Sequence, residues 1–139
     1  MSKGEEKIIK LLQRSQYRFE REKRFEDLKK GRYRFDFYIY RYGGPAIVEF
    51  QGQQHYQYID KFYRSRAEFE SAKERDRRKI SYCLAHKIPI YVIPYWEIEN
   101  IHTAADLFKS KFLATTRWKN DKDWQKKKIW QNDWKFDIL

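Results

Sequence analysis

The sequence predicts a mixed α/β domain with a small central sheet flanked by helices, and three observations support this fold class. Apolar and polar residues alternate over 33–40, and a short apolar run follows at 46–50, as is typical of β-strands. Serine capping boxes precede two amphipathic segments, as they do at helix starts. A third apolar run at 88–94 contains prolines near both ends, which favours a buried central or parallel strand.

The first half of the chain contains one helix and three extended segments. A helix is expected from the box Ser2-Lys3-Gly4-Glu5 to about Arg14. Charged residues between aromatic ones then predict a half-exposed strand or extended arm over 17–25. The strands 33–40 and 46–50 are joined by the turn Gly43-Gly44-Pro45, and we expect them to be antiparallel, with Asp36 on the face opposite Phe35 and Phe37.

Two further helices are expected in the second half. One starts at the box Ser65-Arg66-Ala67-Glu68 and runs to about His86. The other opens at Thr103-Ala104-Ala105-Asp106 and places Leu107, Phe108 and Phe112 on its inner side.

Length and composition exclude several classes of protein. The chain has 139 residues, enough for one core domain, which we assign to 1–115. Aromatic residues make up 19% of the sequence, which argues against disorder. The single Cys83 excludes a disulfide scaffold and favours a reducing, cytoplasmic setting. No apolar run is long enough to span a bilayer, so we expect no membrane partner.

The segment 116–139 differs from the rest of the chain. Four of the five tryptophans lie in it, among lysines and aspartates. We interpret it as a Trp/Lys-rich C-terminal extension that packs on the core domain or on a partner protein. Stacking of these tryptophans on bases is the alternative.

Basic residues are concentrated at both ends of the chain. The net charge is +11, with +6 in residues 1–35, zero in 36–64, +2 in 65–116 and +3 in 117–139. Such a balance favours a polyanionic partner, and we expect double-stranded DNA. An ordinary solvated surface is the alternative interpretation.

Three carboxylates occupy positions where a purely structural carboxylate would be costly. Asp36 and Glu49 lie on the two strands of the predicted hairpin, and Asp76 falls on the apolar stripe of the helix that begins near 65. Each can be a satisfied buried group. Together they can converge, and clustered carboxylates need protonation or a cation such as Mg²⁺ or Mn²⁺.

The segment Glu49-Phe50-Gln51-Gly52-Gln53-Gln54-His55 adds polar groups to this cluster. Alternation puts Glu49 and Gln51 on one side of the strand, and Gly52 allows the turn that would bring His55 back over that side. His55 is then able to orient a water, donate a proton or contact phosphate. Otherwise it is a loop histidine bonded to backbone.

An Asp on one strand, followed thirteen residues later by Glu-x-polar on the next, resembles the core of the PD-(D/E)XK nucleases. The segments Glu74–Ser81 and Tyr95–Glu97 are similar to the very-short-patch-repair (Vsr) endonucleases. Related homing endonucleases and small phage proteins carry a comparable E-F-x-G-x-x-H segment. The resemblance covers roughly residues 4–101 and implies a restriction-endonuclease-like core.

The resemblance also implies roles for individual residues. Asp36 and Glu49 would hold Mg²⁺ or Mn²⁺, with the backbone or side chain at Gln51 completing the metal shell. His55 would be catalytic and Asp76 would orient it or link to the metal. Glu6, or Glu5 in another register, corresponds to the outlying acid of the family.

Gln51 departs from the family pattern, because a lysine usually stands there. Lys79 lies one helical turn after Asp76, and this spacing of three returns its ammonium toward the same site. Without a cationic substitute the chain would bind DNA and cut it slowly or not at all.

Basic and aromatic side chains supply the expected nucleic-acid surface. They are Lys7, Lys10 and Arg14 on the first helix, Arg75, Arg77 and Arg78 around Asp76, Arg18, Arg21, Lys23 and Arg24 on the arm, and Tyr56 and Tyr58 in the loop after the second strand. The tyrosines have an alternative role, as a loop folded over the core.

The expected function is therefore metal-dependent DNA cleavage of the Vsr-like or homing type, with no small-molecule cofactor beyond the metal. One site makes one nick, so a double-strand break needs a homodimer or two successive events. The first rival is a nuclease fold that has lost turnover and binds DNA or a protein. The second is a resolvase of branched DNA, such as a Holliday junction.

Overall fold

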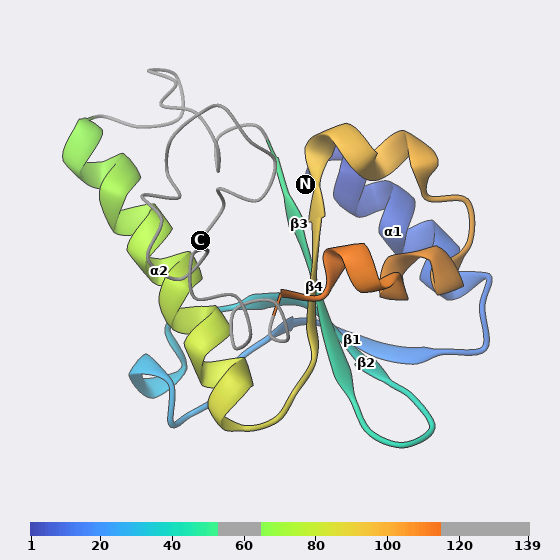
Figure 1. Ribbon diagram of the computed structural model, residues 1–139, viewed down its shortest axis with the longest axis horizontal. Helices are drawn as coiled ribbons and strands as arrows, with labels where there is room; N and C mark the ends of the chain where they lie inside the picture. Colours follow the sequence, from blue (N-terminus) through green and yellow to red (C-terminus); the bar gives the residue numbers. More distant parts are fainter. Residues whose placement is uncertain (53–64, 115–139) are drawn as a thin grey trace.

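A four-stranded sheet lies between two layers of helices in the computed structural model, which describes residues 1–52 and 65–114 (Figure 1). The strands are β1 (Arg18–Lys23), β2 (Phe35–Tyr40), β3 (Ala46–Gln51) and β4 (Ile90–Pro94), in that spatial order. The pairs β1–β2 and β2–β3 are antiparallel, and β3–β4 is parallel. This mixed α/β architecture confirms the fold class expected from the sequence.

The two long helices cover opposite faces of the sheet. Figure 1 shows α2 (Arg66–Ala85) on one side and α1 (Lys3–Gln13) on the other. Both predicted capping boxes start a helix: the Ser2 and Ser65 hydroxyls each accept a hydrogen bond of 3.1 Å, from the backbone N–H groups of Glu5 and Glu68 respectively.

Short 3₁₀ helices supply the remaining helical structure of the described chain. They are η1 (Lys29–Gly31), η3 (Tyr95–Asn100), η4 (Ala104–Phe108) and η5 (Ser110–Phe112).

Each face of the sheet carries its own buried core. Ile8 and Leu12 of α1 pack with Val48 and Ile93, whereas Ile80 of α2 packs with other sheet residues. The members of this second core are Phe35, Ile47, Ile80, Cys83, Ile90, Val92 and Ala114. Neighbouring residues of β3 therefore belong to different cores, as the two-residue period of a strand requires.

The predicted facing of β2 is wrong at its first residue. Phe37 lies in the core beside α1, but Phe35 lies in the core beside α2. Residues two apart on a regular strand share a face, so β2 changes its facing at Asp36. The register between β2 and β3 also ends nearby, at the pair Phe37–Val48.

The predicted third α-helix is also wrong. Its capping box is present. The Thr103 side chain accepts a hydrogen bond from the backbone N–H of Asp106, and the Asp106 carboxylate accepts one from the backbone N–H of Thr103. However, η4 ends at Phe108, and Lys109 is extended, with φ −66° and ψ 142°. A segment this short gains too few backbone hydrogen bonds to sustain an α-helix, so two 3₁₀ turns form instead.

Several residues singled out in the sequence lie outside the described parts of the chain. These are His55, Tyr56, Tyr58 and the extension 116–139. Within 1–52 and 65–114, no helix has both the length and the apolar character needed to cross a membrane.

Candidate functional site

Asp36 and Glu49 bridge the open end of the β2–β3 hairpin. The backbone N–H of Asp36 donates to Glu49 Oε2 at 2.6 Å, and the backbone N–H of Phe50 donates to Asp36 Oδ2 at 2.8 Å. These two side-chain bonds lie beyond the last paired residues of the strands, Phe37 and Val48. The carboxylates therefore satisfy N–H groups at the end of the ladder and are held firmly in place.

Lys79 reaches the same point from α2. Its Nζ donates a short hydrogen bond to Glu49 Oε1 and lies 4.9 Å from the centre of the Phe35 ring. Lys79 is 7% exposed and Glu49 is 6% exposed, so this is a buried ion pair. Asp76, three residues earlier on α2, is also buried and acts electrostatically on Lys79. The helical spacing thus brings a lysine to the carboxylates, as expected from the sequence.

Burial and neighbouring charges shift the pKa values of Asp36 and Lys79 in this cluster. Burial, followed by repulsion from Glu49, raises the pKa of Asp36 well above its ordinary value. Burial also opposes the positive charge of Lys79, but the carboxylates of Glu49, Asp36 and Asp76 outweigh it and raise the pKa of the ammonium. Lys79 is therefore charged at neutral pH, and its ammonium offsets the charge of Glu49, which it contacts directly.

A cleft of about 550 Å³ opens beside Asp36, Asp76 and Lys79. Besides these three, its lining residues are Glu5, Arg21, Glu22, Arg32, Tyr33, Arg34 and Arg75. Acidic groups and arginines therefore share the cleft. Neither Glu49 nor Gln51 belongs to the lining.

The donor atoms near Asp36 match those that Mg²⁺ or Mn²⁺ prefers. Carboxylate oxygens come from Asp36 and Glu49, and Gln51 shares the face of β3 that carries Glu49. Gln51 is 2% exposed, and its Oε1 has no hydrogen-bond partner among the described residues. A buried amide oxygen of this kind fits a cation ligand.

Lys79 limits that fit in the present arrangement. Both Glu49 oxygens are already engaged, one by the backbone of Asp36 and one by Lys79. Over the described ranges, no three His, Cys, Asp or Glu side chains lie together as a metal-binding group. A metal held by Asp36, Glu49 and Gln51 would therefore have to share Glu49 with the ammonium.

The two candidates for the outlying acid on the first helix, Glu5 and Glu6, differ in position. Glu5 lines the cleft and lies 3.8 Å from Arg21 of β1, whereas Glu6 is exposed and does not line it.

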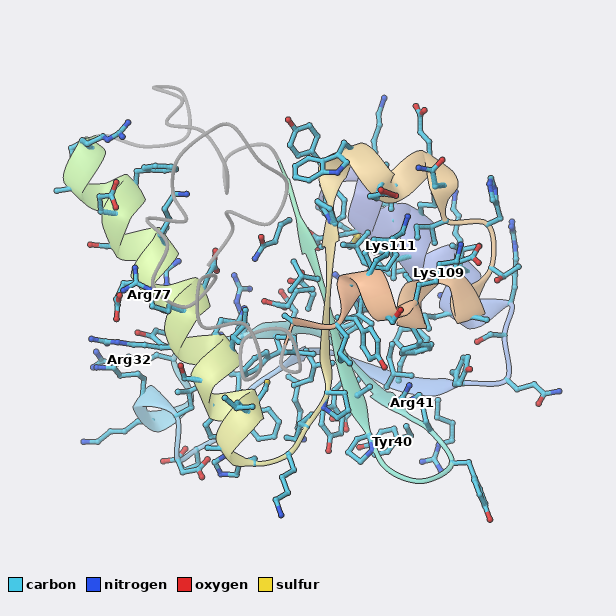
Figure 2. The ribbon with its side chains drawn as sticks, viewed as in Figure 1. Arg32, Tyr40, Arg41, Arg77, Lys109 and Lys111 are labelled. Carbon is cyan, nitrogen blue, oxygen red and sulfur yellow. The ribbon has the colours of Figure 1, made fainter. Side chains whose placement is uncertain are left out.

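The predicted nucleic-acid residues divide into different environments. Arg75 lines the cleft. Arg77 and Arg78 pair with Glu74 at 2.6 and 3.4 Å, so part of their charge is offset within α2. Figure 2 shows Arg77 on the side of the molecule that also carries Arg32.

The basic residues predicted at the first helix, Lys7, Lys10 and Arg14, lie in different environments. The Lys7 Nζ donates to the carbonyl oxygen of Ile98 at 2.8 Å and ties α1 to η3. Lys10 is exposed, and Arg14 lies at the other end of the helix from the cleft.

Four cleft residues were not found from the sequence, and one of them is Glu22 of β1. Arg32, Tyr33 and Arg34 precede β2 directly and contribute to the lining. Alternation gave no signal for Arg32, because its backbone is helical and not extended, with φ −74° and ψ −30°.

Comparison with known proteins gives no relative. No protein-family model matches the chain, and neither a curated protein nor a solved structure matches it. The interpretation of the site therefore depends on its own geometry and chemistry.

Proposed function

We propose that the chain is a metal-dependent DNA endonuclease of the PD-(D/E)XK type, similar to the Vsr-like and homing endonucleases. One observation carries the proposal: the Lys79 ammonium meets Glu49 directly beside Asp36. A strand aspartate, a strand glutamate and a lysine are the three groups of that core, and here the lysine comes from α2 instead of position 51. Lys79 thus supplies the cation that Gln51 lacks.

The side chains would have separate roles in phosphodiester hydrolysis. Asp36, Glu49 and Gln51 would hold Mg²⁺ or Mn²⁺, which when bound polarises the phosphate and lowers the pKa of the attacking water. Lys79 would stabilise the negative charge that develops on the phosphate oxygens. Asp76 keeps Lys79 charged and oriented. His55, outside the described residues, would position or transfer the proton.

The arginines of the cleft would hold the DNA backbone. Arg32, Arg34 and Arg75 line the cleft beside Asp36 and can contact phosphates on either side of the scissile bond. Such contacts are independent of sequence and depend steeply on salt. We therefore expect double-stranded DNA as substrate, with a homodimer or two events for a double-strand break.

A plasmid-nicking assay with Mg²⁺ or Mn²⁺ tests this proposal. Wild type should convert supercoiled plasmid to the nicked form, and Asp36→Asn should abolish the conversion while keeping the acceptor for the Phe50 N–H. Asp27→Asn is the matched control, because Asp27 is an exposed carboxylate that bonds Tyr82 and His86 away from the cleft. Cleavage that persists in Asp36→Asn, or no cleavage by wild type with either metal, would refute the proposal.

A DNA- or protein-binding module without turnover is the second candidate. The observation in its favour is that both Glu49 oxygens are occupied in the folded chain. Thermal unfolding with and without Mn²⁺ separates the two candidates, because a ligand that binds only the folded state raises the melting temperature. DNA binding by wild type without nicking, combined with no shift in Mn²⁺, would favour the module.

A further inference from the structure

A second cavity of about 620 Å³ lies at the opposite ends of α1 and β2 from the candidate cleft. Its lining residues are Leu11, Arg14, Ser15, Gln16, Tyr17, Tyr40, Arg41, Tyr42, His102, Thr103, Ala104 and Ala105, and we call it the tyrosine–arginine pocket. It shares no residue with the cleft. Asp36 and Tyr40 are four residues apart on β2, so the two cavities are separated by about 13 Å along the strand.

Among the residues that the structure describes, arginines but no acidic side chains line this pocket. Arg14 and Arg41 form no ion pair with any residue of 1–52 or 65–114, unlike Arg77 and Arg78 beside the cleft. An unpaired pair of arginines at one cavity favours an anionic ligand, because guanidinium groups bind phosphate in a bidentate manner.

Arg41 is fixed in position by aromatic rings. Its guanidinium carbon lies 4.7 Å from the ring centre of Phe108 and 5.6 Å from that of Tyr91. Its Nε is buried and has no hydrogen-bond partner in the described chain. A buried donor without a partner is costly, and a ligand acceptor at this point would satisfy it. Arg41 is thus prearranged, and little side-chain entropy is lost when an anion binds.

Three tyrosines supply planar surfaces at the same cavity. Tyr17 packs edge-on against Phe108, and Tyr40 donates its hydroxyl hydrogen to Glu20 beneath Arg18. Tyr42 is fully exposed, so one of its faces is available for stacking. Figure 2 shows Tyr40 and Arg41 near the β2–β3 hairpin, on the other side of the view from Arg32 and Arg77.

We propose that the tyrosine–arginine pocket is a nucleotide site, in which Arg14 and Arg41 hold a phosphate and Tyr42 stacks on the base. Guanidinium groups bind phosphate, and exposed aromatic rings stack on bases. Together they recognise a phosphate that is joined to a planar base. A free mononucleotide and a nucleotide of single-stranded DNA both provide it. This site goes beyond the proposed nuclease function, since it needs neither the metal nor any residue of the cleft.

Titration of ¹⁵N-labelled full-length protein tests the site, with dTMP, the oligonucleotide (dT)8 or inorganic phosphate as probes. All titrations contain EDTA, so their outcome does not depend on metal-dependent cleavage. We expect dTMP or (dT)8 to shift the amide signals of Arg14, Tyr42 and His102. Arg14→Gln and Tyr42→Ala should each weaken this binding about fivefold or more, the loss that corresponds to one charged hydrogen bond or one stacked base.

Arg66→Gln is the matched control, because it makes the same substitution at an exposed arginine of α2 that pairs with Glu70 and lines neither cavity, so dTMP binding should be unchanged. Binding of dTMP identifies the free nucleotide as the ligand, and binding of (dT)8 alone identifies the single strand. The proposal is overturned if neither probe shifts these signals at about 5 mM, well above a Kd typical of weak sites. It is also overturned if inorganic phosphate produces the same shifts and Tyr42→Ala has no effect.

Discussion

Removal of the Lys79 ammonium is the sharpest test of how the site is built. Lys79 and Glu49 are both more than nine-tenths buried, and Asp36 and Asp76 lie close enough to raise the pKa of the lysine. Lys79→Met keeps most of the apolar length of the side chain but leaves the Glu49 carboxylate buried without its partner. Loss of one member of a buried pair costs about 3–5 kcal/mol.

Thermal unfolding measures this loss directly. For a chain of this length the expected decrease in melting temperature is roughly 10–20 °C. Lys111→Met is the control, because Lys111 is half-exposed and pairs with Glu97 at 3.2 Å near the surface, so little change is expected (Figure 2). The double variant Glu49→Gln/Lys79→Met should recover part of the stability, since it removes the unpaired charge. A loss below about 1 kcal/mol in Lys79→Met, as for an exposed pair, would refute the reasoning.

Three further outcomes follow from the same structure. Burial and Glu49 raise the pKa of the Asp36 carboxyl group in the folded protein. The contribution of this group to folding stability is therefore full below its unfolded pKa of 3.8, and it is lost as the pH rises through its folded pKa. In EDTA, the melting temperature of Asp36→Asn should therefore exceed that of wild type at pH 8 and equal it near pH 4. A melting temperature below that of wild type at pH 8 would contradict the raised pKa of Asp36. Gly4→Ala should destabilise by about 1–3 kcal/mol in urea unfolding, because the added Cβ would lie 2.3 Å from the Phe50 ring, and Phe50→Leu should relieve the effect. A stabilised Gly4→Ala chain would show that the ring moves away freely. Burial raises the pKa of the Cys83 thiol, so native protein should react with a chromogenic disulfide reagent at least about 100-fold more slowly than protein in urea; equal rates would show that the thiol is accessible.

Local patterns in the sequence predicted the elements that depend on local chemistry. Capping boxes identified both α-helix starts, at Ser2 and Ser65, alternation identified β2, and a short apolar run identified β3. The spacing of three also predicted that Lys79 lies on the same side of its helix as Asp76. These features depend on residues close together in the chain.

Features that depend on distant contacts were not predictable in the same way. The change of facing at Asp36 arises where the β2–β3 ladder ends and side chains replace backbone partners. The burial of Lys73 and Lys79 on α2 runs against their polarity, since an apolar stripe on that helix has no place for a lysine. The segment from Thr103 has helical periodicity, but tertiary packing divides it into 3₁₀ turns.

The division of the charged cluster between two layers has a consequence for when the proposed site forms during folding. Asp36 and Glu49 belong to the sheet, whereas Lys79 is carried by α2, which meets the sheet through Ile80 and Cys83. A chain in which the hairpin has formed but α2 has not docked holds two adjacent carboxylates and no ammonium. Docking of the helix thus completes the charge arrangement in the same step that closes the core, so incompletely folded molecules should be inert toward DNA.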